Sequence, residues 1–219
     1  MRYIIALLFI LISIVTVAAD EADDEAYKAL IKQGTELFFA AKLPEAITIF
    51  TKASELPGKA PEVWQRGIAY YYNADYAAGR KQFELHRTVN PDDVENAVWH
   101  FLCVARNESV AAARAALLPV TDDTRIPMKE IYTLYAGTGY ASNIIAAADV
   151  PGVSEKDRRR RLCYAHLYTG LYYEAVGDTE KSQYHMLKAA NDFSMPHFMG
   201  RTAALHVRLR GWLPKDAAR

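Results

Sequence analysis

Cysteine is scarce in this chain of 219 residues, and its two thiols exclude a familiar class of sites. Cys103 and Cys163 do not form a Cys-x-x-Cys pair with any neighbour, so a redox or zinc motif of that type is excluded. Both cysteines lie within apolar helical patterns, which favours two buried thiols that behave as small hydrophobic residues. A disulfide between them in an oxidising compartment is the alternative.

The chain also lacks an excess of charge of either sign. It has 26 Lys and Arg against 26 Asp and Glu, for a formal net charge of +0. A nucleic-acid-binding domain is usually basic, so we predict no nucleic-acid partner. The motifs Gly-x-Ser-x-Gly and His-Glu-x-x-His and the phosphate-binding loop are missing as well. No segment shows convincing strand alternation, so the chain is expected to be all-α.

The N-terminus has the features of a secretory signal. Arg2 supplies a positive charge, residues 3–15 are almost wholly apolar, and small residues up to Ala19 precede the acidic Asp20. We therefore expect cleavage near Ala19, with residues 1–19 as signal peptide, and a periplasmic or secreted mature protein. An uncleaved membrane anchor is the alternative, although the apolar run is short for a spanning helix of about 20 residues.

Two stretches of the chain carry the same pattern of glycine and aromatic residues. The step from Gly34 to Gly67 is 33 residues, and so is the step from Phe50 to Phe83. A third set near the C-terminus keeps the order: Gly170, Tyr173, Ser182, Met186 and Ala189. This pattern resembles the tetratricopeptide repeat (TPR), which has a period of about 34 residues and two antiparallel helices per repeat.

The repeat pattern gives each position a physical role. The glycine of the first helix lets the second helix approach closely, and the small residue at position 46, 79 or 182 is expected where the two helices cross. The Phe or Met four residues later is expected to fill the gap to the next repeat. One helix pair cannot bury its apolar face alone, so the pairs must stack.

We predict a TPR-like α-solenoid of stacked helical hairpins over residues 20–212, followed by a tail at 213–219. The repeats are expected at about 27–58, 61–92, 94–119 and 163–194. The third is degenerate, with Phe101, Ala113 and Leu117 at the repeat positions, and a shorter helix pair follows it without the signature. A helix over about 196–209 is expected to cap the C-terminal end of the stack.

Aromatic residues on the first helix of each repeat form the predicted binding surface. Tyr and Trp give a large contact area at low entropic cost, which suits an interface. The predicted concave groove is lined by Ile31, Thr35, Trp64, Ile68, Tyr71 and Tyr72. Packing against loops or a dimer partner is the alternative for the aromatic members, and core or dimer packing is preferred for Phe38 and Phe39.

An enzyme is the alternative to a binding protein. His100 and Cys103 are three residues apart on one predicted helix and share a face. With the acidic residues Asp92, Asp93 and Glu95, they could serve a helical metal-dependent or hydrolytic enzyme. However, an apolar mid-helix position raises a thiol pKa and blocks access, and no spacing demands a metal site. We therefore predict no catalytic residue, no metal and no cofactor.

Four segments carry a closer family resemblance. Residues 61–71, Asn90 to Asp93, Val98 to Leu102 and Ala165 to Val207 resemble the bacterial envelope lipoprotein NlpI family of TPR proteins. The resemblance implies a homodimeric adaptor that binds other proteins, among them envelope proteases and peptidoglycan hydrolases. No cysteine lies near Ala19, so the lipid attachment typical of those lipoproteins is not expected.

Overall fold

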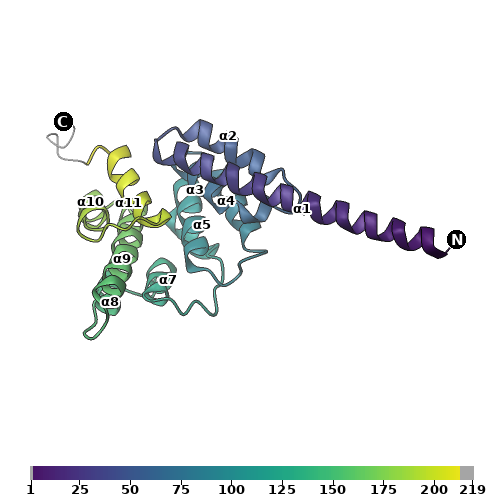
Figure 1. Ribbon diagram of the computed structural model, residues 1–219. Helices are drawn as coiled ribbons and strands as arrows, with labels where there is room; N and C mark the ends of the chain where they lie inside the picture. The colour runs from purple at the N-terminus through teal and green to yellow at the C-terminus, as the bar shows by residue number, and fades with distance from the viewer. Residues whose placement is uncertain (1, 213–219) are drawn as a thin grey trace.

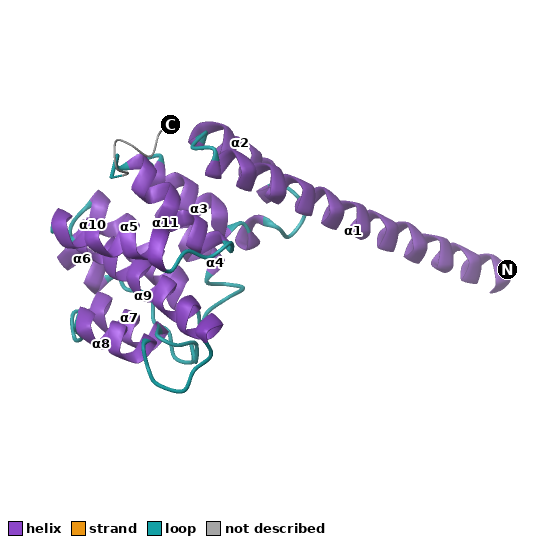
Figure 2. Cartoon of the chain, turned by 60° about the vertical axis from the view of Figure 1, so that its left-hand side comes forward, coloured by secondary structure: helices purple, strands orange, loops and turns teal. Residues whose placement is uncertain are grey.

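The computed structural model describes the backbone of residues 2–212 and the side chains of residues 21–212. Within this range the chain is all-helical and contains no strand (Figure 2). The α-helices are α1 Arg2–Phe39, α2 Leu43–Ser54, α3 Trp64–Tyr72, α4 Tyr76–His86, α5 Val94–Asn107, α6 Val110–Ala115, α7 Met128–Ala136, α8 Ala141–Ala148, α9 Glu155–Ala175, α10 Thr179–Leu187 and α11 Phe198–Leu209. Short helical turns cover Ala60–Glu62 and Lys188–Asp192.

Two predicted end segments fall partly or wholly outside this description. The side chains of the predicted signal segment, 1–19, and the whole of the tail, 213–219, lie outside the described residues. Within residues 21–212, no helix is both long enough and apolar enough to cross a membrane.

Neighbouring helices pack in pairs along the chain (Figure 1). Helix α1 packs on α2, α3 on α4, α5 on α6, α7 on α8, and α9 on α10. Side chains cap several of the helices at the positions that the sequence marks. Asp75 accepts a hydrogen bond from the backbone N–H of Ala78, and Ser154 accepts one from that of Asp157. These caps satisfy donors that a helix start leaves unpaired.

One contact recurs in three of the helix pairs. A Cβ atom added at Gly34 would lie 2.5 Å from the ring of Phe50, and one at Gly67 would lie 2.6 Å from the ring of Phe83. In the last pair, a Cβ at Gly170 would meet Met186 at 3.0 Å. The large side chain therefore packs on the glycine of its own pair. That it also fills the gap to the next repeat stays a prediction.

The small residues at the helix crossings behave as expected. A Cβ atom on Gly79 would lie 3.2 Å from the carbonyl oxygen of Gly67. The Ser182 hydroxyl donates a 2.8 Å hydrogen bond to the carbonyl of Gly170. A larger side chain at either position would force the two helices apart, because protein interiors are close-packed.

The C-terminal helix does more than end the array. Phe198, at the start of α11, stacks on Phe38 of α1 with ring centres 5.4 Å apart, and lies edge-on to Trp64 of α3 at 4.9 Å. Arg208 of α11 donates a 2.6 Å hydrogen bond to the carbonyl oxygen of Phe39. Helix α11 therefore packs across the inner face of the first two helix pairs.

Candidate functional site

The structure buries most of the predicted groove. Ile68 is fully buried, and Tyr71 and Tyr72 are 2% and 9% exposed. Tyr72 lies against His206 of α11, with its hydroxyl 3.1 Å from Nδ1, and the Tyr71 hydroxyl donates a 2.8 Å hydrogen bond to Glu174 of α9. The prediction that these three residues line an open groove is therefore wrong, because α9 and α11 cover them.

The remaining groove residues lie nearer to solvent. Ile31 and Thr35 on α1 are half-buried, as is Trp64 at the start of α3. Of the six predicted residues, Trp64 lines the cavity described below. The sequence thus indicated one wall of the candidate site and missed the others.

A partly open cavity of about 320 Å³ lies where five helices of the chain meet. Its size is at the lower end of the range for ligand pockets. Helices α3, α4, α5, α9 and α11 and the loop before α5 supply its walls: Trp64, Phe83, His86, Asn90, Asp93, Glu95, Asn96, Trp99, Tyr164, His197, Phe198 and Met199. The walls combine large aromatic surfaces with two carboxylates, and neither Lys nor Arg is among them.

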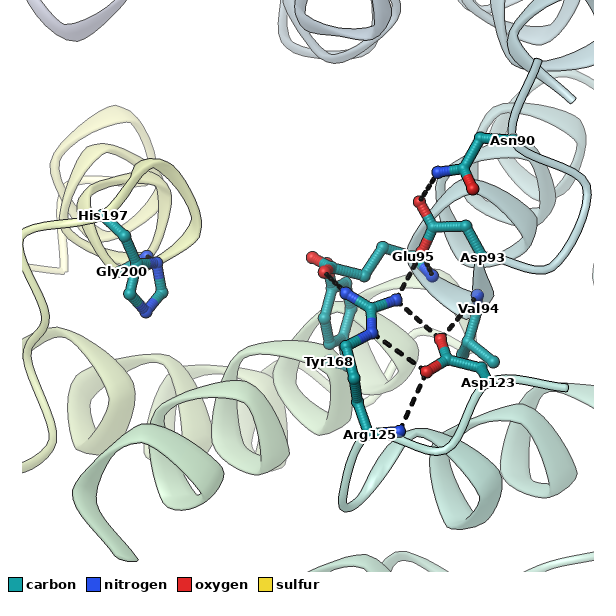
Figure 3. Close-up of polar contacts among 9 residues, drawn as sticks. All are labelled: Asn90, Asp93, Val94, Glu95, Asp123, Arg125, Tyr168, His197 and Gly200. Carbon is teal, nitrogen blue, oxygen red and sulfur yellow. Dashed lines mark hydrogen bonds and ion pairs between the residues drawn. The ribbon is translucent and has the colours of Figure 1, made fainter. Parts of the chain in front are cut away.

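A polar network supports the acidic wall of the cavity (Figure 3). Arg125 donates 2.6 Å hydrogen bonds to Oδ1 of Asp93, Oε1 of Glu95 and Oδ2 of Asp123. Asp123 also accepts a hydrogen bond from the backbone N–H of Val94, at the start of α5. The loop that carries Asp123 and Arg125 is in this way fixed to the N-terminus of α5.

Glu95 is the carboxyl of this network whose pKa is shifted toward neutrality. It is 8% exposed, and its second oxygen accepts a hydrogen bond from the buried Tyr168 hydroxyl of α9. Burial, together with the nearby charge of Asp93, raises the pKa of Glu95 to about 7, although Tyr168 and Arg125 act in the opposite direction. A buried carboxyl with such a pKa, at the edge of a cavity, marks a candidate functional site.

Three polar atoms of the cavity walls are buried without a hydrogen-bond partner. They are Oδ1 of Asn96, Nε1 of Trp99 and Nε2 of His197. Asn96 and Trp99 are 5% and 1% exposed. Buried polar groups are nearly always paired, and leaving one unpaired costs about 1–3 kcal/mol. In this structure the three atoms are closed off from the open volume of the cavity, so a ligand would pair with them only after the wall side chains move.

His197 has a defined tautomer in this arrangement. Its Nδ1 accepts a 3.2 Å hydrogen bond from the backbone N–H of Gly200 and so caps the start of α11. The neutral ring must then carry its proton on Nε2, which makes that nitrogen a donor. Tyr164 stacks on the same ring, with centres 5.1 Å apart, and holds its orientation.

Of the residues named for the alternative enzyme hypothesis, Asp93 and Glu95 line the cavity, whereas His100 and Cys103 are not among its walls. Cys103 is fully buried, and burial raises the pKa of its thiol. His100 is 1% exposed and its Nε2 lies 3.3 Å from Glu84. Both cysteines are free, buried thiols. Within residues 21–212, no three His, Cys, Asp or Glu side chains are arranged to hold a metal ion.

Comparisons with known proteins assign no family to this chain. No protein-family model matches it, and no curated protein matches it at a significant level. The function is therefore argued from the cavity and its walls.

Proposed function

We propose that this protein is an exported adaptor of the TPR type, which binds a segment of a partner protein at the cavity between α3, α4, α5, α9 and α11. The observation that carries the proposal is the cavity itself, where aromatic walls surround three buried polar atoms without partners. A solvent-accessible aromatic pocket with a few polar groups is the usual form of a recognition site. The repeated Gly–Phe and Gly–Met contacts support the TPR assignment.

The partner classes come from the family resemblance. The NlpI-like segments contribute seven of the residues that line the cavity: Trp64, Asn90, Asp93, Trp99, His197, Phe198 and Met199. We therefore include envelope proteases and peptidoglycan hydrolases as partner classes, and a homodimer as the assembly. No metal, cofactor or nucleic acid has a role in this proposal.

The test places a photo-crosslinking amino acid at one of two positions. Asn90 is an exposed residue at the rim of the cavity, and Tyr140 is a 73% exposed aromatic residue that does not line it. Crosslinking in the native envelope fraction should give a discrete partner band from Asn90 and none from Tyr140. Equal labelling from both positions, or none from either, would contradict the proposal.

A second function is favoured by one observation, the raised pKa of Glu95. A carboxyl with a pKa of about 7 can act as a general acid or base near neutral pH. The test is a screen of ester, glycoside and peptide hydrolysis, followed by Glu95→Gln. An enzyme would show a turnover limb near pH 7 that the variant loses, whereas an adaptor would show no turnover.

A further inference from the structure

We propose that the cavity recognises the side chain of an arginine or lysine in an extended partner segment. The inference rests on the proposed binding function and names the chemistry of what is bound. It is carried by the charge of the cavity walls, by their aromatic surfaces and by the unpartnered polar atoms.

The charge around the cavity is negative. Asp93 and Glu95 are in its walls, Asp123 lies behind them, and the guanidinium of Arg125 is the one cation that contacts all three. The N-terminus of α5 adds a positive charge of roughly half a unit. With Glu95 protonated, Asp93 and Asp123 carry two negative charges against the one positive charge of Arg125. The half charge at the N-terminus of α5 offsets only part of the remaining negative charge. A cation is therefore favoured over an anion.

The aromatic walls favour the same kind of ligand. Trp64 and Phe198 meet edge to face with centres 4.9 Å apart, and Trp99 and Tyr164 supply further ring surface. A cation over the face of Trp or Tyr gains about 0.5–1 kcal/mol at an exposed site and about 2 when desolvated. Aromatic rings beside carboxylates thus suit an ammonium or guanidinium group better than a purely apolar side chain.

The unpartnered atoms favour a peptide over a free metal ion or a simple amine. Nε1 of Trp99 and Nε2 of His197 are donors that fit backbone carbonyl groups, and Oδ1 of Asn96 is an acceptor that fits an N–H. All four carboxylate oxygens of Asp93 and Glu95 already accept hydrogen bonds, from Asn90, Glu95 N–H, Arg125 and Tyr168, so any ligand cation must share them through their remaining lone pairs.

The experiment measures binding of short capped peptides to the purified protein by titration calorimetry. The peptides share one neutral sequence and differ in a central Arg, Lys, norleucine or Glu. The Arg and Lys peptides should bind at least about tenfold more tightly than the norleucine peptide, and the Glu peptide should not bind. Equal binding of the norleucine peptide would overturn the inference, and so would equal binding of free arginine amide or of a divalent metal alone.

Two substitutions distinguish the effect of a carboxylate in the cavity wall from a general effect of the protein's net charge. Asp93→Asn should weaken the Arg peptide by about tenfold or more, while Asp149→Asn, a carboxylate that pairs with Arg158 outside the cavity, should leave it unchanged. If Asp93→Asn does not fold, Trp64→Leu at the opposite wall tests the same site and should weaken binding too. Unchanged affinity in a folded cavity variant overturns the inference.

The crosslinking and the peptide titrations together distinguish failure of this inference from failure of the proposed function. A partner crosslinked from Asn90, together with no preference for basic peptides, would refute the cation assignment and keep the adaptor function. Absence of any crosslink from Asn90 would refute the adaptor function itself.

Discussion

The close contact between Gly67 and Phe83 gives a sharp test of how the helix pairs are held together. A Cβ atom on Gly67 would lie 2.6, 2.8 and 3.0 Å from three atoms of the Phe83 ring. Phe83 is 1% exposed and lines the cavity, so the ring can relieve the clash only by moving toward that cavity. We therefore examine Gly67→Ala as an overpacking substitution.

The expected magnitude is the balance of two opposing effects. Overpacking a buried contact costs about 1–3 kcal/mol, whereas Ala is better than Gly in a helix by about 0.8–1 kcal/mol. Gly67→Ala should therefore lower the free energy of unfolding by about 0–2 kcal/mol. At this chain length that corresponds to a fall in Tm of roughly 0–8 °C.

A double-mutant cycle identifies the cause. With Phe83→Leu the ring is gone, so Gly67→Ala in that background should be neutral or slightly stabilising, with a coupling energy of about 1–3 kcal/mol. The assay is reversible urea unfolding followed by helical circular dichroism. Gly34→Ala with Phe50→Leu is the matched cycle in the first helix pair and should give the same sign. Zero coupling in both cycles would refute this account of the packing.

Three further predictions concern burial and pH. Tyr71→Ala should destabilise the fold by about 3–5 kcal/mol, because a buried aromatic side chain is lost; an unchanged Tm would restore the open groove that the sequence first suggested. Burial lowers the pKa of His166, His185 and His206 to about 4 from 6.5, so the unfolded chain binds more protons between these values, and Tm should rise as the pH increases from about 4 to about 6.5. Glu95 acts in the opposite sense, since its pKa of about 7 in the folded protein exceeds the ordinary Glu pKa of 4.5. The stability of the native protein relative to Glu95→Gln should therefore fall by up to about 3 kcal/mol as the pH rises between these values. Parallel plots of Tm against pH for the two proteins would contradict this prediction.

The local structure of the chain could be predicted from its sequence because its signals are local. Caps such as Asp75 and Ser154 and the turn glycines fix helix ends within a few residues. The Gly34–Phe50 contact spans only two neighbouring helices. Pattern and spacing report on such contacts, since both partners lie in one repeat.

The candidate site could not be predicted to the same extent because long-range contacts build it. The Tyr168–Glu95 hydrogen bond joins residues 73 positions apart, and the bond from Arg125 to Glu95 joins a loop to a helix start. His197 reaches the cavity only because α11 returns to the first helix pairs. The one available signal was the acidic run Asp92, Asp93 and Glu95, which the sequence analysis placed in the enzyme alternative.

The hydrogen bond from Arg208 to Phe39 joins residues 169 positions apart and turns a linear array into a closed loop. A linear array can gain or lose a unit, since each unit touches only its neighbours and the stabilities add. Because α11 contacts α1 and α3, the helices between them must span a fixed distance. An inserted or deleted helix pair would therefore pull Phe198 away from Phe38 and Trp64. The number of helix pairs is thereby set by the closure, and α1 and α11 should unfold together although they stand at opposite ends of the chain.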